Sequence, residues 1–228
     1  MKLRPLVLLI FGCGALAVLC WLYYGVARPR LVLAAAPSAE VLDDLAEGCR
    51  RKRVQAVQYD YYAGIADSEG ECCAAELFRA LALSARVQER FGADLIGRLG
   101  GRYRPPQRIL IFRSTTAGNL HRSLLHEQHE DDSLRCSRID YHLRCGNHRC
   151  AEVLIRFAAA DLRCRMLLEH CCQTPEAGRN VLHYAVCPHC GNLYETIACD
   201  RYCPHCLTDG RRFIRFERRG GTTATRFP

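Results

Sequence analysis

Two copies of the motif CPHC lie close together near the C-terminal end of the chain. Each Cys-x-x-Cys forms a tight turn that directs two sulfurs toward one point, and two such turns complete a tetrahedron around one metal ion. Twelve residues separate the two motifs, which favours a shared metal over a pair of redox-active disulfides. The predicted metal ligands are Cys187, Cys190, Cys203 and Cys206.

The identity of this metal is left open by the four ligands alone, because thiolates in a tetrahedron suit zinc and iron equally well. Zinc has no redox chemistry and would act as a structural staple for a fold too small to be stable by itself. Iron would make the site a one-electron carrier. One ion per chain is expected in either case. Cys199 lies between the motifs and is interpreted as a bystander.

The N-terminal segment contains an uncharged apolar run at residues 5–27. This run exceeds the roughly 20 residues that a helix needs to cross a bilayer, and aromatic side chains cluster at its far end, as they do at a membrane interface. We expect residues 1–28 to form a single-pass transmembrane anchor and residues 29–39 to form a linker. A cleaved signal peptide or a lipoprotein is the alternative. Two basic residues flank the run on each side, so the side of the membrane that carries the rest of the chain is unresolved.

The composition indicates an ordered protein, because 49% of its residues are hydrophobic and 25% are charged. The formal net charge is +8, and the charges are scattered except in a basic tail that includes residues 218–228. A nucleic-acid-binding surface would show a basic stripe with interleaved aromatic residues, and the sequence has none, so nucleic acid is not expected as a partner. Ten of the sixteen cysteines lie outside the apolar run and the CPHC motifs, and most of these ten fall inside helical patterns, which is not typical of a small secreted disulfide scaffold.

The middle of the chain has the three- and four-residue spacing of apolar side chains that is typical of amphipathic helices. A long crossover containing Pro105 and Pro106 separates two helical hairpins, and Gly70 and Gly146 lie in their turns. Two hairpins joined in this way predict a ferritin-like four-helix bundle over residues 40–176. The expected helices cover residues 40–67, 71–98, 116–143 and 149–172.

Near the C-terminal end, Tyr184 precedes CPHCG, Tyr194 and Glu195 follow it, and a second CPHC comes before Phe213 and Phe216. This segment resembles the C-terminal segment of the rubrerythrins. The segment TAGNLHRSLLHEQHE at residues 116–130 also resembles the start of the family's third bundle helix. The resemblance covers about residues 40–217. It implies a ferritin-like bundle that holds two irons, followed by a small β domain at residues 180–217 that is rubredoxin-like and holds iron on four cysteines.

The resemblance also implies peroxide reduction at the paired irons, a redox partner protein and a homodimer. The chain departs from the family at the iron ligands. The first-helix Glu position is Lys52, and the second-helix Glu-x-x-His falls on Ala85 and Gln88. The last two helices keep residues that can bind a metal. This candidate second metal site consists of Glu127, Glu130, Asp161 and Cys164.

Three interpretations of the bundle remain open: a purely structural bundle, a site for a single additional metal ion, and an unconventional di-iron site. Lys52 would bring a positive charge to a pocket meant for two cations, so we expect rubrerythrin-type peroxidase activity to be impaired or absent, and no catalytic residue is assigned. Leu207 also stands where the rubredoxin pattern has glycine. The first hypothesis is a membrane-anchored, rubrerythrin-like metal-binding protein that transfers electrons through its four-cysteine iron. The alternative is a non-enzymatic structural or partner-binding module stapled by a zinc ribbon.

Overall fold

The computed structural model describes residues 38–129, 132–173, 184–196 and 199–216. Within these ranges no helix is both long enough and apolar enough to cross a membrane. The apolar run at residues 5–27, most of the expected linker and the basic tail lie outside the described residues. The membrane anchor therefore stays a prediction.

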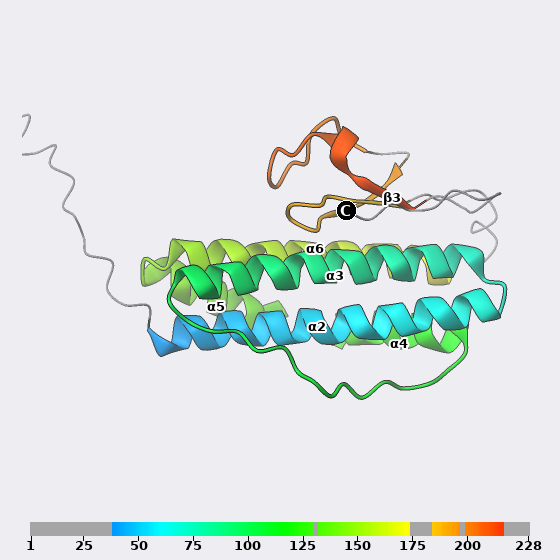
Figure 1. The fold of residues 1–228 in the computed structure, drawn as a ribbon, viewed down its shortest axis with the longest axis horizontal. Coiled ribbons are helices and arrows are strands. Elements are labelled where there is room, and N and C mark those ends of the chain that lie inside the picture. The colour runs from blue at the N-terminus through cyan, green and yellow to red at the C-terminus, as the bar shows by residue number, and fades with distance from the viewer. Residues whose placement is uncertain (1–37, 130–131, 174–183, 197–198, 217–228) are drawn as a thin grey trace, which may run out of the picture. The chain divides into compact units, whose positions relative to one another are not determined.

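The described part of the chain is mainly helical, as expected, and its long helices lie side by side (Figure 1). A crossover leads from the end of α3 to the start of α4, and the third expected helix is described as two segments, α4 and α5, on either side of residues 130–131. The other bounds agree with the sequence expectation to within one or two residues. The helices are α2 (Ala39–Ser68), α3 (Cys72–Arg98), α4 (Thr116–His129), α5 (Asp132–Arg144) and α6 (His148–Gln173).

The helix ends follow from local sequence. The Ser38 hydroxyl accepts a hydrogen bond from the Val41 amide and caps the start of α2. Gly70 and Gly146, the two glycines expected in hairpin turns, have φ angles of +77° and +75°. Residues with a Cβ pay a steric cost in this left-handed region, so glycine allows each helix to end and the chain to reverse.

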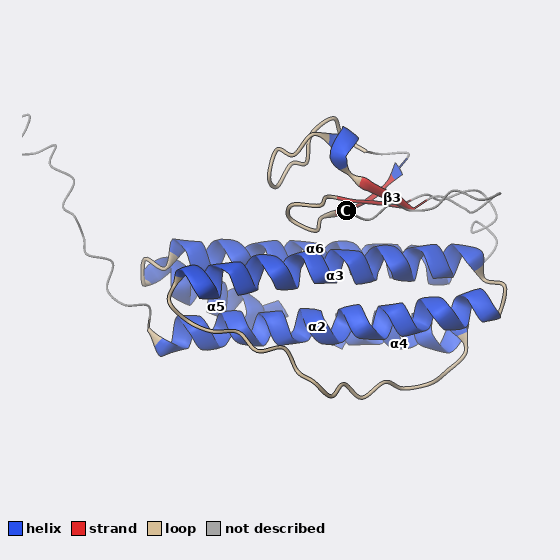
Figure 2. Ribbon diagram, viewed as in Figure 1, coloured by secondary structure: helices blue, strands red, loops and turns tan. Residues whose placement is uncertain are grey.

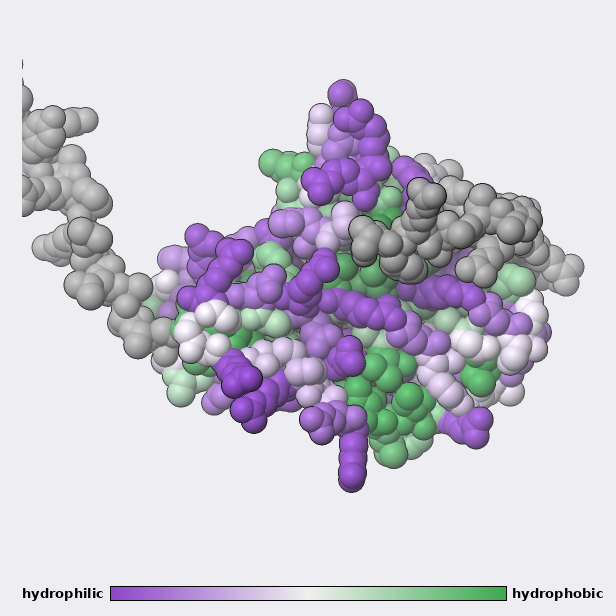
Figure 3. Space-filling model, in the orientation of Figure 1, coloured by the Kyte–Doolittle hydropathy of each residue, from purple (hydrophilic) through white to green (hydrophobic). Residues whose placement is uncertain are grey.

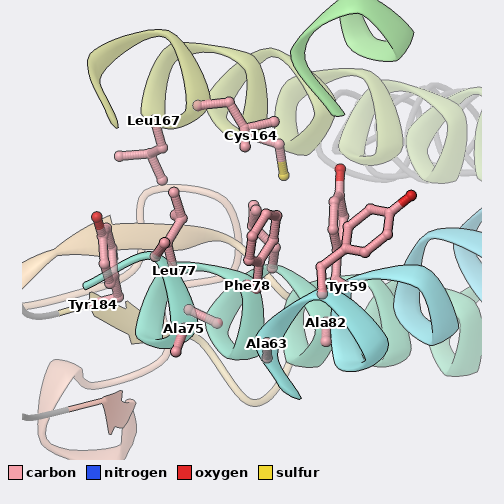
Figure 4. Packing of buried hydrophobic residues seen from close by; sticks show 14 of the residues in the cluster. Tyr59, Ala63, Ala75, Leu77, Phe78, Ala82, Cys164, Leu167 and Tyr184 are labelled. Carbon is pink, nitrogen blue, oxygen red and sulfur yellow. The ribbon is translucent and has the colours of Figure 1, made fainter. Parts of the chain in front are cut away.

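The bundle core is continuous with the small C-terminal domain. One buried cluster joins Phe78 and Leu81 of α3 to Leu168 of α6, and Tyr184 and Leu193 of the small domain belong to the same cluster. Figure 4 shows part of this packing, with Tyr184 beside Leu77. Hydrophobic burial therefore holds the small domain against α3 and α6. On the face shown in Figure 3 the surface is mostly hydrophilic, with hydrophobic side chains gathered over the crossover, where Leu110 and Phe112 are exposed.

The small domain is built on an antiparallel three-stranded sheet with the order β2-β1-β3 (Figure 2). The strands are β1 (Tyr184–Val186), β2 (Leu193–Glu195) and β3 (Ile214–Phe216). Tyr184 pairs with both Glu195 and Phe216. The first CPHC motif forms the turn between β1 and β2, and the second lies between β2 and β3.

Polar contacts fix the first motif to the bundle. The Ser84 hydroxyl of α3 donates to the Gly191 carbonyl, and Ser84 in turn accepts from Gln88. Arg90 of α3 donates to the carbonyl of Pro188, and Arg163 of α6 donates to the carbonyl of Leu193, both at 3.2 Å. A Cβ on Gly191 would lie 2.7 Å from the Ser84 carbonyl oxygen and 3.0 Å from Gln88 Cγ. Glycine at position 191 thus permits the close approach of the motif to α3.

We predict that Gly191→Ala destabilises the protein more than Gly146→Ala does. Both glycines have nearly the same positive φ, so the conformational cost, about 1–2 kcal/mol, is shared. A Cβ at Gly146 meets no atom within 4 Å, whereas a Cβ at Gly191 meets α3 backbone. The overlap should add about 1–3 kcal/mol to the loss for Gly191→Ala. Denaturant unfolding of both variants measures the difference, and equal losses would show that the domain contact is not tight.

Candidate metal centre

The four predicted cysteine ligands lie together at one end of the small domain. The Sγ atoms of Cys187 and Cys206 are 3.5 Å apart, as are those of Cys190 and Cys203. All four sulfurs lie within 4.8 Å of one another. Metal–sulfur bonds of about 2.3 Å in a tetrahedron require sulfur separations of about 3.8 Å. The four sulfurs, called the tetrad below, therefore fit around one tetrahedral metal ion. Small shifts of the sulfurs would bring them to the separations of a regular tetrahedron.

The two motifs form equivalent turns. The Gly191 amide donates to the Cys187 carbonyl at 2.9 Å, and the Leu207 amide donates to the Cys203 carbonyl at 2.8 Å. Gly191 has a φ of +77° and Leu207 a φ of +58°. Leu207 is thus held in a left-handed conformation at a cost of about 1 kcal/mol, and its side chain is 76% exposed. The departure from glycine at this position leaves the turn of the second motif unchanged.

Hydrogen bonds to Cys203 favour the anionic form of its sulfur. The Tyr194 hydroxyl donates to Cys203 Sγ at 3.1 Å, and the Thr208 hydroxyl lies 3.1 Å from Cys206 Sγ. The pKa of Cys203 is held well below that of a free thiol, because the thiols of Cys187 and Cys190 donate to its sulfur and Tyr194 adds a further bond. Protons shared among four close sulfurs are readily displaced by a cation, since thiolates are the metal ligands.

The roles of Tyr194 and Thr208 were missing from the sequence interpretation. Tyr194 belongs to the sequence pattern that resembles the rubrerythrins, but the pattern alone does not indicate its hydrogen bond to Cys203. For Thr208 the sequence carries no signal, because its contact with Cys206 depends on how the second motif turns. Cys199 is not a member of the tetrad, as expected.

The bundle interior contains an ion pair at the position expected for the first iron ligand. Lys52 is 1% exposed and Asp161 is 3% exposed, and Lys52 Nζ donates to Asp161 Oδ1. The guanidinium groups of Arg51 and Arg135 each lie 3.8 Å from Asp161 Oδ2. Lys52 Nζ also lies 5.6 Å from the centroid of the Phe157 ring. The negative charge of Asp161 is therefore neutralised by side chains of this protein.

The other described residues of the candidate second site are also buried and partnered. Glu127 Oε1 accepts from Gln55 Nε2 at 2.9 Å and from the Tyr59 hydroxyl at 3.1 Å. Burial and the charge of Glu127 raise the pKa of the Cys164 thiol well above its usual value. Figure 4 shows Cys164 of α6 and Tyr59 of α2 pointing into the same interior space.

These residues do not fit the two-iron centre that the resemblance implied. An ammonium group stands at the first-helix Glu position, and the second-helix positions hold Ala85 and Gln88, both buried and neither a carboxylate nor an imidazole. In the described residues the four cysteines alone meet the distance criterion for a metal group. Glu130 lies outside the described residues, so the single-metal site at Glu127, Glu130, Asp161 and Cys164 stays a prediction.

Comparison with known proteins supports the fold. No family model matches the chain, and no curated protein matches it. Among solved structures, nigerythrin in a mixed-valent state has a TM-score of 0.69 at 18% identity, covering 82% of this chain and 91% of that chain. Fully reduced, all-ferrous nigerythrin has a TM-score of 0.70 at 18% identity with the same coverage. Partially reduced nigerythrin has a TM-score of 0.69 at 19% identity, covering 80% of this chain and 90% of that chain. The chain therefore has the ferritin-like helical fold of nigerythrin, and its resemblance to the rubrerythrins is confirmed at the level of the fold.

Proposed function

We propose that this protein is a one-electron carrier whose redox centre is an iron ion held by Cys187, Cys190, Cys203 and Cys206. The observation that carries the proposal is the buried tetrad of sulfurs, which is geometrically suited to one metal and receives hydrogen bonds. The proteins of the same fold support iron, because their structures were solved in mixed-valent and all-ferrous states. Iron on four thiolates supplies a one-electron couple without bond making or breaking.

The chain's own residues set the properties of such a centre. Cys187, Cys190 and Cys203 are buried, so water is kept from three of the sulfurs. Cys206 is partly exposed, which makes its sulfur the route for electrons between the centre and the surface. The Tyr194 hydroxyl and the neighbouring backbone amides stabilise negative charge on the sulfurs and so favour the reduced state.

We assign no peroxide chemistry to the bundle. The Lys52–Asp161 pair and the contacts of Glu127 stabilise the bundle as a scaffold, and no catalytic step is derived through a metal there. The apolar run at residues 5–27 supports the additional proposal that the scaffold is tethered to a membrane.

A structural zinc site is the second candidate function. Half of the buried residues in the small domain's own core are cysteines of the tetrad: Cys187, Cys190 and Cys203, packed with Ala185, Tyr194 and Phe213. A domain with so few other core residues depends on its metal for stability, whichever metal it holds. A redox-inert ion would meet that need equally well.

Metal analysis of the purified full chain distinguishes the two candidates. We expect one iron per chain and a red protein that bleaches on reduction. Cys187→Ser and Cys203→Ser should abolish the colour and the bound iron. Cys199→Ser is the matched control, because it removes a cysteine of the same domain that lies outside the tetrad, and it should keep both. A colourless protein with one zinc per chain would establish the structural alternative.

A change at Tyr194 tests whether the sulfur hydrogen bond tunes the centre. Tyr194→Phe should lower the reduction potential by an amount on the order of tens of millivolts, because a bond of about 0.5–1.5 kcal/mol that favours the reduced state is lost. Spectroelectrochemical titration measures the shift. Tyr202→Phe, at an exposed tyrosine of the same domain, should leave the potential unchanged. An unchanged potential in Tyr194→Phe would remove Tyr194 from the redox role.

A double-mutant cycle tests the scaffold role of the ion pair. Lys52→Met should cost about 3–5 kcal/mol of unfolding free energy, because Asp161 then stays buried without its ammonium partner. Lys52→Met combined with Asp161→Leu should recover most of that loss, since replacing both partners with apolar groups is often neutral. Denaturant unfolding gives the energies, and elemental analysis should show the metal content unchanged in all variants. Loss of a metal ion in Asp161→Leu would instead reveal a metal in the bundle.

A further inference from the structure

A pocket of about 350 Å³ lies between α3, α6 and the first CPHC motif. Pro188 and His189 of the motif form one side of it. The His189 ring meets the Phe91 ring of α3 edge-on, with centroids 6.3 Å apart. The pocket is thus adjacent to the metal centre but contains none of its ligands. Its volume lies at the lower end of the roughly 300–1,000 Å³ that is typical of small-molecule sites.

The pocket is rich in positive charge. Its arginines are Arg90, Arg98, Arg149 and Arg156. Only two carboxylates line the same pocket, Asp94 and Glu152, and Glu152 is paired with Arg156 at 2.7 Å. Four guanidinium groups against two carboxylates leave a surplus of two positive charges. Within the part of the chain that the structure describes, no ion pair involves Arg98 or Arg149.

Arg156 is held in the wall of the pocket by its contacts with Glu152 and Phe91. Its side chain is only 17% exposed, and its Nη1 is a buried donor with no hydrogen-bond partner in the described structure. Its guanidinium is fixed over the Phe91 ring, 4.8 Å from the centroid, so the group is held in place. Arg156 therefore contributes a positive charge of fixed position to the wall of the pocket.

The remaining wall of the pocket is apolar and comes from Val87, Leu95 and Val153 together with Phe91. A simple inorganic anion bound at the arginines would leave these apolar side chains exposed to water. Arginine forks match the oxygens of phosphate, and an apolar wall is suited to the body of an organic ligand. We propose that this pocket binds a small organic phosphate of the mononucleotide class, with its phosphate at the arginines and its apolar body against the α3–α6 wall.

Binding does not depend on which metal the tetrad holds, so this proposal and the proposed electron transfer can fail separately. Each nucleoside monophosphate, AMP, GMP, CMP and UMP, is titrated into the full-length chain by calorimetry. At least one should bind at least tenfold more tightly than its own nucleoside and than inorganic phosphate. Absence of binding by all four would overturn the proposal, as would nucleosides that bind as tightly as their monophosphates.

A matched pair of variants locates the site. Arg98→Gln combined with Arg149→Gln should weaken binding at least tenfold. Arg79→Gln combined with Arg86→Gln makes the same change of net charge on exposed α3 arginines outside the pocket, and it should leave binding unchanged. Circular dichroism checks that both variants fold. Equal weakening in the two variants would show general attraction to a basic protein and would overturn the assignment to this pocket.

Discussion

The structure depends on how its bundle neutralises buried charge. Burying an unpaired carboxylate is costly, so interior carboxylates need a cation, a metal ion or a set of donors. Here Lys52 provides the cation for Asp161, and neutral donors satisfy Glu127 Oε1. Because a side chain supplies the positive charge beside Asp161, this carboxylate needs no metal ion to balance its charge. The ion pair therefore stabilises the packing of α2 against α6.

The small domain differs from the bundle in how its core is built. The domain's own core is small, and half of its residues are cysteines of the tetrad, so a metal ion bound there would complete the core. Its sheet also shares a buried cluster with α3 and α6, and Gly191 lets the first motif reach the α3 backbone. The scaffold therefore orients the metal centre. A rigid attachment of the small domain to α3 and α6 suits an electron carrier, because the metal centre then changes its structure little when an electron is transferred.

Features set by local sequence could be predicted from the chain alone. The helices follow from apolar spacing and from the glycines at Gly70 and Gly146, and the tetrad follows from the spacing of two short motifs. The position of Lys52 inside the bundle could also be predicted, because the resemblance, counted from Gly70, places this residue where the family has an inward-facing side chain. The ion pair between Lys52 and Asp161 could not be predicted in this way. The two residues are 109 positions apart in the sequence and meet only because α2 packs against α6.

The backbone conformation of the second motif and the pocket beside the first motif also depend on contacts that local sequence does not predict. Leu207 departs from the glycine pattern, yet its backbone adopts the left-handed turn, because the tetrad and the Cys203 carbonyl contact outweigh a strain of about 1 kcal/mol. A divalent metal on four thiolates carries a net charge of about −2, and arginines of α3 and α6 surround the first motif. The surplus positive charge of the pocket thus has two consequences. It stabilises the anionic centre nearby and attracts an anionic ligand, so a phosphate bound beside His189 would offset that charge and make reduction of the centre less favourable.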